Sequence, residues 1–235
     1  MNEALHDTEL STTENQEVRI MLVDDHPLLR KALRQVLETE GDFRIIAEAS
    51  DGEEAIRIAT ELVPDVIIMD ITMPKINGIE ATRQIKERCP NIAVLVLTVH
   101  DDSEHVMGIL EAGAAGYLTK TIFSDTVIHA VRGVLAGESV LSSAVLRQII
   151  GNVSLRERKP VNLGTGEKIT GRELEILRLA ATGMANKEIA LQLGIGLRTV
   201  KSYLQNIFAK LNVVSRTEAV ITALKNGILT MDDFV

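Results

Sequence analysis

Uninterrupted short apolar runs alternate with amphipathic helical segments through the first half of this chain. The clearest runs are Ile20–Val23, Val66–Met69 and Val94–Leu97, and weaker ones lie at Phe43–Ala47 and Tyr117–Leu118. A strand that is apolar at consecutive positions is typically buried on both faces, as in a parallel sheet. Strands that alternate with helices in this way predict an α/β fold, a doubly wound five-stranded parallel sheet with helices on both faces.

The second half of the chain lacks this alternation. Residues 142–150 have a helical pattern, and residues 152–168 are rich in Gly, Pro, Asn and charge, which indicates a linker. From Thr170 onward the pattern is helical only. The predicted helix boundaries are capping boxes at Thr170–Glu173 and Ser215–Glu218 and breaks at Gly183, Gly194 and Asn212. We therefore expect a small all-α domain of four helices after the α/β domain.

Length and composition indicate two domains in a cytoplasmic protein. The chain has 235 residues, 46% of them apolar, and one cysteine, Cys89, which excludes an internal disulfide. No apolar run comes near the length of a membrane span, about 20 residues. Residues 1–16 carry four acids and neither Lys nor Arg, so we expect a disordered leader and no signal peptide. The expected divisions are a leader at 1–16, an α/β domain at 17–139, a linker with a helix at 140–167 and an all-α domain at 168–235.

Charge is distributed unevenly between the two predicted domains. The net charge of −8 alone argues against nucleic acid as a partner. Residues 17–139, however, hold 12 Lys and Arg against 21 Asp and Glu, whereas residues 140–230 hold 13 against 6. The balances of −9 and +7 predict different ligands for the two domains, the second of them rich in phosphate.

Polar side chains close four of the predicted strands. They are Asp24 and Asp25 after the first, Asp70 after the third, Thr98 at the end of the fourth, and Thr119 and Lys120 at the end of the fifth. Ligands of an open parallel sheet bind outside the carboxyl ends of its strands. Three carboxylates that converge there repel one another unless a cation neutralises them, and an oxygen-rich site of this kind suits Mg²⁺. A magnesium-dependent phosphoryl site is therefore predicted.

The groups of this site match the needs of phosphoryl transfer. A carboxylate that attacks a phosphoryl group needs a metal and an ammonium to balance the charge on the equatorial oxygens. Asp25, Asp70 and Lys120 supply those parts. The Thr98 hydroxyl could bond the new phosphoryl group, which adds a charge of about −1.5 to −2 and three strong acceptors.

The motifs that carry these residues resemble the receiver domain of response regulators. They are Leu22-Val-Asp-Asp25, Asp70-Ile-Thr-Met-Pro74 with Gly78, Leu97-Thr98 and Gly116-Tyr-Leu-Thr-Lys120. The resemblance covers residues 17–139 and implies a flavodoxin-like sheet of strand order 2-1-3-4-5. It also implies that Asp70 accepts phosphate from the phosphohistidine of a sensor histidine kinase.

The same resemblance implies a role for each of the other site residues. Lys120 pairs with the acyl phosphate, and Thr98 and Tyr117 move together as a switch. The implied ligands of Mg²⁺, direct or through water, are Asp24, Asp25, Asp70 and the backbone carbonyl of Thr72.

A helix-turn-helix pattern dominates the second domain. Ile189, Ala190 and Leu193 lead through Gly194 into a helix whose apolar face includes Val200, Leu204, Ile207, Phe208 and Leu211. Polar side chains on the other face of such a helix can read base edges in a major groove, and neighbouring polar groups can hold phosphates. The candidates for phosphate are Asn186, Lys187, Arg198, Thr199 and Lys210.

Residues 168–230 resemble the LuxR-type helix-turn-helix of NarL/FixJ regulators, through Ile169–Leu177, Ala185–Ala190 and Thr199–Ile207 followed by Lys210-Leu211. The resemblance implies base contacts by Lys201, Ser202 and Gln205. Tyr203 replaces the histidine that is common in this family, and it either bonds phosphate or covers apolar surface. The segment from Ser215 to Lys225 offers an apolar face that serves as a dimer contact in the family or as part of the core.

The leading hypothesis is a two-component response regulator, a non-enzymatic transcription factor whose binding to promoter DNA, as a homodimer, is controlled by phosphate on Asp70. A DNA-binding protein that ignores phosphorylation is the first alternative. A phosphatase of the haloacid dehalogenase type is less favoured, because Thr72 stands where a second aspartate is expected. A ligand-sensing LuxR-type receptor is also less favoured, because aromatic residues make up only 3% of the chain.

Overall fold

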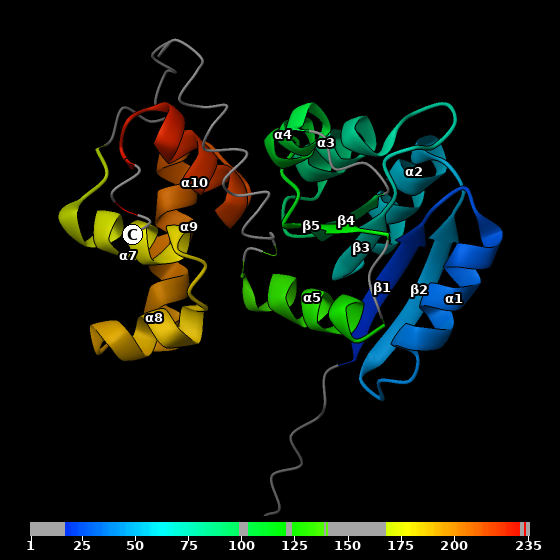
Figure 1. The fold of residues 1–235 in the computed structure, drawn as a ribbon, viewed down its shortest axis with the longest axis horizontal. Coiled ribbons are helices and arrows are strands. Elements are labelled where there is room, and N and C mark those ends of the chain that lie inside the picture. The colour runs from blue at the N-terminus through cyan, green and yellow to red at the C-terminus, as the bar shows by residue number, and fades with distance from the viewer. Residues whose placement is uncertain are drawn as a thin grey trace, which may run out of the picture.

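In the computed structural model, residues 17–98, 103–120, 124–138, 140, 168–230 and 233 are described (Figure 1). The predicted leader at 1–16 and the predicted linker helix at 142–150 lie outside the described residues. No described helix has both the length and the apolar character needed to cross a membrane.

The first part is a five-stranded parallel sheet of order β2-β1-β3-β4-β5, as predicted. Its strands are β1 (Val18–Val23), β2 (Phe43–Ala49), β3 (Val66–Met69), β4 (Ala93–Thr98) and β5 (Gly116–Thr119). The connecting helices are α1 (Pro27–Leu37), α2 (Gly52–Leu62), α3 (Gly78–Arg88) and α4 (Ser103–Glu111), and α5 (Ser124–Ala136) follows the last strand. Each pair of neighbouring strands is parallel, so all the strands end at the same edge of the sheet.

The two faces of the sheet support two separate cores. Successive side chains of a strand point to opposite faces, and in β1 Met21 and Val23 pack under α2, α3 and α4. Ile20 and Leu22 pack on the other face, under α1 and α5. Consecutive apolar residues in the strands are therefore explained by burial on both sides of the sheet.

The C-terminal part consists, within residues 168–230, of four helices around a third core, as predicted. They are α7 (Gly171–Ala181), α8 (Asn186–Leu193), α9 (Leu197–Leu211) and α10 (Arg216–Lys225). Gly194 and Asn212 end α8 and α9 in the left-handed conformation. The predicted capping box at Thr170 and Glu173 is present.

Helix α2 begins one residue later than the motif Ser50-Asp-Gly-Glu53 suggests. This motif fits a capping box with Ser50 as the N-cap and Glu53 as its acidic member. In the structure Asp51 is the N-cap and accepts a hydrogen bond from the backbone N–H of Glu54. Both Ser50 and Asp51 suit an N-cap, and the carboxylate of Asp51 is favoured because it also meets a lysine from another loop.

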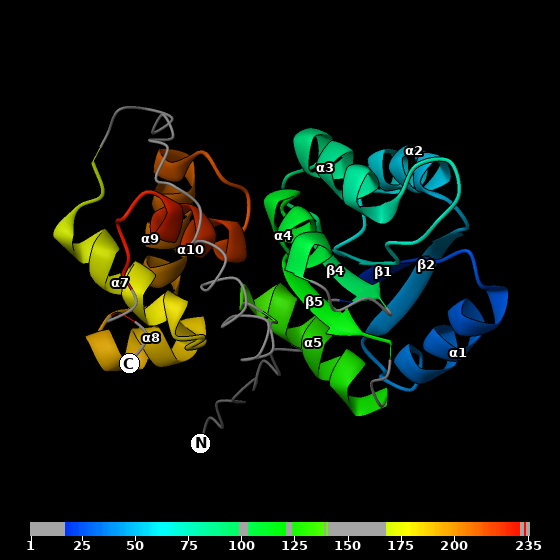
Figure 2. The ribbon, with the colours of Figure 1, turned by 45° about the horizontal axis from the view of Figure 1, so that its top comes forward.

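Helix α10 lies between α9 and the α/β part, next to α4 and β5 (Figures 1 and 2). The hydroxyls of Ser215 and Thr217 donate hydrogen bonds of 3.4 and 3.3 Å to the carbonyls of Ala114 and Ala115, in the loop before β5. Ile221 is 3% exposed and belongs to the core that includes α4 and β5. The two parts of the molecule are therefore packed together through α10.

Candidate functional site

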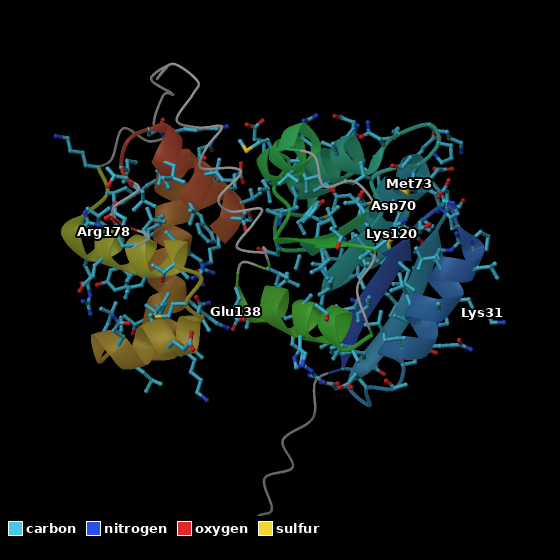
Figure 3. The ribbon with its side chains drawn as sticks, viewed as in Figure 1. Lys31, Asp70, Met73, Lys120, Glu138 and Arg178 are labelled. Atoms are coloured by element: carbon cyan, nitrogen blue, oxygen red, sulfur yellow. The ribbon has the colours of Figure 1, made fainter. Side chains whose placement is uncertain are left out.

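The candidate site lies where the strand order of the sheet reverses, between β1 and β3. Crevices form outside the carboxyl ends of strands at such a point, because the connections leave in opposite directions. Asp24 follows β1 directly, and Asp70 follows β3 and donates its N–H to the carbonyl of Val23 at 2.8 Å. Figure 3 shows Asp70 beside Lys120, which follows β5. The predicted convergence of these strand-end residues is present in the structure.

Lys120 joins the two buried carboxylates. Its Nζ lies 2.7 Å from Asp24 Oδ2 and 2.8 Å from Asp70 Oδ2, and the three side chains are 11%, 4% and 3% exposed. Burial raises the pKa of Asp70, although the ammonium of Lys120 opposes this. Burial alone would lower the pKa of Lys120, but the two carboxylates outweigh it and raise that pKa. The site is thus a buried, charged triad that has formed at the cost of desolvation.

Asp25 stands at the more exposed side of the same cluster. The His26 ring nitrogen Nδ1 lies 2.6 Å from Asp25 Oδ1 and 3.2 Å from Asp24 Oδ1. The contact with Asp25 lacks hydrogen-bond geometry, so that Asp25 Oδ1 is enclosed without a hydrogen-bond partner among the described residues. A buried oxygen of this kind carries an unmet need for a donor or a cation.

The cluster has the composition of a metal site. Asp24, Asp25, His26 and Asp70 each offer one ligand atom, and these atoms lie within 4.8 Å of one another. Converging carboxylate oxygens suit a hard divalent cation. The enclosed Oδ1 of Asp25 fits such a cation, which would supply the missing partner. The cluster is therefore consistent with the acidic metal site of receiver domains.

The other predicted residues of this site surround the triad at different depths. Thr98 ends β4 and is fully buried, and the Lys120 N–H donates to its carbonyl at 2.6 Å. Tyr117 on β5 is buried in the core that α10 completes through Ile221. Thr72 lies exposed in the loop between β3 and α3.

A close main-chain contact shapes that loop. The Gly78 N–H donates to the carbonyl of Ile71 at 2.9 Å, which brings the end of the loop back to its beginning. A Cβ at position 78 would lie 1.9 Å from the carbonyl oxygen of Asp70. Only glycine allows this approach, so Gly78 of the receiver-like motif is required by the geometry behind Asp70.

The exposed face of α9 presents most of the residues predicted to bind DNA. Within the described part of the chain, Arg198, Thr199, Lys201, Ser202 and Gln205 are all exposed on this helix, while Val200, Leu204, Ile207 and Leu211 are buried against the core. Tyr203 is half-buried against the same core, and Lys187 is exposed on α8. In this arrangement α9 is open to solvent along its polar face.

Two of the predicted phosphate contacts are engaged elsewhere. Asn186, 4% exposed, donates from Nδ2 to the carbonyl of Ala136 at the end of α5, at 2.8 Å. Lys210 lies 2.8 Å from the carboxylate of Glu173. Burial would raise the pKa of Glu173, but Lys210 and the capping interactions of Thr170 together lower it. In this arrangement both side chains are held by partners within the protein.

Arg216 is a buried cation that the sequence pattern did not single out. It donates to the carbonyls of Ala180 and Met184 at 2.8 and 2.6 Å, and to Asn186 Oδ1 at 3.3 Å. Burial lowers its pKa to about 10, against the opposing charges of Glu138 and Glu188. Figure 3 shows Glu138 between the two parts of the molecule. Arg216 is the first residue of α10, a position that is usually exposed, so the sequence pattern gives no sign of its burial.

Comparisons with known proteins agree with this geometry. The family model of the response regulator receiver domain matches residues 20–132, and that of the bacterial regulatory proteins of the luxR family matches residues 167–223. The transcriptional regulatory protein LiaR of Bacillus subtilis (strain 168) is 41% identical over 212 residues, which cover 90% of this chain and 99% of LiaR. The response regulator protein VraR of Staphylococcus aureus (strain NCTC 8325 / PS 47) is 39% identical, with the same coverage.

A solved structure supports the fold. The crystal structure of a two-component response regulator of the LuxR family from Aurantimonas sp. SI85-9A1 is 38% identical, covers 58% of this chain and 97% of its own, and superposes with a TM-score of 0.55. Fold, site and comparisons together define a signalling protein that couples a receiver to a DNA-binding helix-turn-helix. The chain belongs to the LuxR-type two-component response regulators, a family of transcription factors and not of enzymes. This excludes the phosphatase alternative.

Proposed function

We propose that Asp70 accepts a phosphoryl group from a sensor histidine kinase and that this phosphate controls binding of promoter DNA through α9. The observation that carries the proposal is the buried triad of Asp24, Asp70 and Lys120 at the reversal of the strand order. A site with these charges is arranged for a dianionic group on Asp70, because Lys120 can turn from the carboxylates to the phosphate. We also propose a cytoplasmic location, where promoter DNA lies.

Mg²⁺ is the proposed cofactor, held by Asp24, Asp25, Asp70 and the backbone carbonyl of Thr72. When bound, the cation neutralises charge on the transferring phosphoryl oxygens. The side chains of this chain do the rest: Asp70 provides the attacking oxygen, and Lys120 balances charge at that oxygen. The Thr98 hydroxyl at the end of β4 is proposed to bond the phosphoryl group, with Tyr117 following its movement.

The proposed DNA contacts are divided between base edges and phosphates. Lys201, Ser202 and Gln205 on the open face of α9 are proposed to read bases. Lys187, Arg198, Thr199 and, after release from their present partners, Asn186 and Lys210 are proposed to hold phosphates, with Tyr203 at the edge of the surface.

The packing of α10 suggests how the receiver controls the second domain. Helix α9 is exposed in this arrangement, whereas α10 and Asn186 at the start of α8 face the receiver. We infer that the packed arrangement withholds α10 and Asn186, and that phosphate on Asp70 favours their release. Released α10 presents its apolar face for a homodimer. The proposed functional units are, in chain order, a leader at 1–16, the receiver at 17–139, the linker at 140–167 and the DNA-binding domain at 168–235.

Phosphorylation of the purified full chain tests the first step. With Mg²⁺ and a small phosphodonor, the wild type should gain the mass of one phosphoryl group, and Asp70→Asn should gain none. Asp42→Asn is a matched control, because Asp42 precedes β2 at the opposite edge of the sheet. Unchanged uptake by Asp70→Asn would show that another residue is the acceptor.

Binding of labelled DNA tests the second step. For the phosphorylated protein, Lys201→Ala should weaken binding to the native promoter by about 1 to 3 kcal/mol and binding to unrelated DNA much less. Equal losses on both DNAs would make Lys201 a phosphate contact. Equal promoter affinity of the phosphorylated and unphosphorylated wild type would favour the alternative of phosphorylation-independent binding.

A further inference from the structure

The loop between β3 and α3 carries a proposed metal ligand but has few main-chain restraints. Its start is held by the Ile71 N–H, which donates to Asp70 Oδ1 at 2.8 Å, and its end by the bond between Gly78 and Ile71. No main-chain hydrogen bond joins residues 72–76 to another described residue. The carbonyl of Thr72 can serve as a ligand only if the loop is held in place by other contacts.

Lys75 provides such a contact and does so from an unusual backbone conformation. Its φ of 64° lies in the left-handed region, where side chains are disfavoured and a turn by itself selects Gly or Asn. The side chain ends at Asp51, with Nζ 2.7 Å from Oδ2, and Glu53 Oε2 lies 3.8 Å away. The unfavourable backbone and the ion pair together indicate that a lysine side chain is needed at this position.

Asp51 is a fixed anchor for that lysine. It is the N-cap of α2, and its other carboxylate oxygen, Oδ1, accepts from the Glu54 N–H at 2.9 Å. The backbone bond to Glu54 and the pairing with Lys75 lower the pKa of Asp51, and the same pairing raises the pKa of Lys75. The pair is therefore charged at neutral pH. Asp51 cannot move without breaking its N-cap hydrogen bond to α2.

A second contact joins the same loop to the same helix end. A Cβ on Gly52 would lie 2.2 Å from the carbonyl oxygen of Ile76. The main chain of the loop thus rests directly on the first residue of α2, which only glycine permits. The ion pair and this close approach act on adjacent residues of both segments.

We propose that Asp51, Gly52 and Lys75 form a clamp that positions the β3–α3 loop and so presents the Thr72 carbonyl to the divalent cation. This inference rests on the proposed function, because it concerns the proposed cation site next to Asp70. Lys75 is a positioning residue in it: its side chain reaches α2 and acts on the site through the backbone. The clamp links the first turn of α2 to the phosphoryl site.

Direct binding of the cation to the full chain tests the clamp. Mn²⁺ binding followed by electron paramagnetic resonance, with Mg²⁺ as competitor, gives the Mg²⁺ affinity without any reaction. Lys75→Gly removes the side chain and relieves the backbone, and it should weaken Mg²⁺ binding about three- to fivefold, the upper part of the range for an ion pair with one exposed partner. Lys75→Arg should restore most of the affinity. Asp51→Asn keeps an N-cap and should match Lys75→Gly, and the double variant should be no weaker than either single one.

Two further measurements separate positioning from general damage. Gly52→Ala, a change that otherwise favours a helix, should also weaken Mg²⁺ because it displaces Ile76. In phosphorylation by a small donor, Lys75→Gly should raise the Mg²⁺ concentration for half-maximal rate and leave the rate at saturating Mg²⁺ near that of wild type.

The outcomes distinguish the clamp from the function on which it rests. Wild-type Mg²⁺ affinity in Lys75→Gly overturns the clamp and leaves the proposed function intact. A loss that Lys75→Arg does not restore, or a lower rate at saturating Mg²⁺, also overturns it. A wild-type protein that binds neither Mn²⁺ nor Mg²⁺ overturns the proposed cation site itself.

Discussion

Replacement of Ile221 by alanine should open the packed arrangement of the two domains. Ile221 is the residue of α10 that belongs to the receiver core, and it is 3% exposed there. Ile221→Ala removes three carbon atoms, each worth about 0.8 kcal/mol when buried, so the packed form should lose about 2.4 kcal/mol. The ratio of packed to open molecules should then fall roughly 50-fold, because about 1.4 kcal/mol corresponds to a factor of ten.

Small-angle scattering of the unphosphorylated full chain measures this opening. The backbone of Ala114 and Ala115 lies under Ser215 and Thr217 in the packed form. Release of α10 from this loop should give Ile221→Ala a larger radius of gyration than the wild type.

The neighbouring residue is the matched control. Val220 is buried in the core of the C-terminal domain and not in that of the receiver. Val220→Ala should therefore lower the melting temperature of the C-terminal domain without increasing the radius of gyration. Equal radii of gyration of Ile221→Ala and the wild type would refute the inference that Ile221 holds the domains together.

Lys210 and Lys86 give two predictions about stability. Lys210→Ala should destabilise the C-terminal domain by about 1 to 3 kcal/mol, because it leaves the buried Glu173 carboxylate without its cation, whereas the exposed Lys201→Ala should change thermal unfolding little. Comparable melting of both variants would contradict a structural role of Lys210. Burial lowers the pKa of Lys86 to about 8 from 10.5, so between these pH values the unfolded chain binds more protons than the folded one. The free energy of unfolding should therefore rise with pH in that range, by at most about 1.4 kcal/mol per pH unit, and denaturant titrations of Lys86→Met should lack this rise. Equal slopes in both proteins would show that Lys86 keeps its proton when buried.

The fold could be predicted because its dominant constraint is local. Each strand of the sheet is a continuous apolar run, and burial on both faces leaves a parallel sheet as the arrangement that satisfies it. No apolar pattern distinguishes one order of strands from another. The strand order was predicted from the resemblance of the motifs around Asp25, Asp70 and Lys120 to those of receiver domains. The structure confirms that order.

The phosphoryl site could be located for the same reason, since the ends of parallel strands meet at one edge. Contacts between distant segments could not be predicted. The pairing of Lys75 with Asp51 joins residues 24 positions apart, and the sequence around Lys75 resembles an ordinary turn. The hydrogen bond from Asn186 to the carbonyl of Ala136 depends on how the two domains pack. The sequence pattern of either domain alone does not predict that packing.

The bond between Asn186 and the end of α5 has a thermodynamic consequence. The last carbonyls of a helix carry partial negative charge, and those of Ala136 and Gly137 accept from Asn186 and Arg216. On the proposed DNA contacts, this helix end takes the place of a DNA phosphate, so α5 and DNA compete for one donor. On our proposal that phosphate on Asp70 favours release of Asn186, linkage requires that DNA and the aspartyl phosphate favour each other by the same factor. A promoter that holds Asn186 would then shift the phosphorylation equilibrium of its regulator toward the aspartyl phosphate.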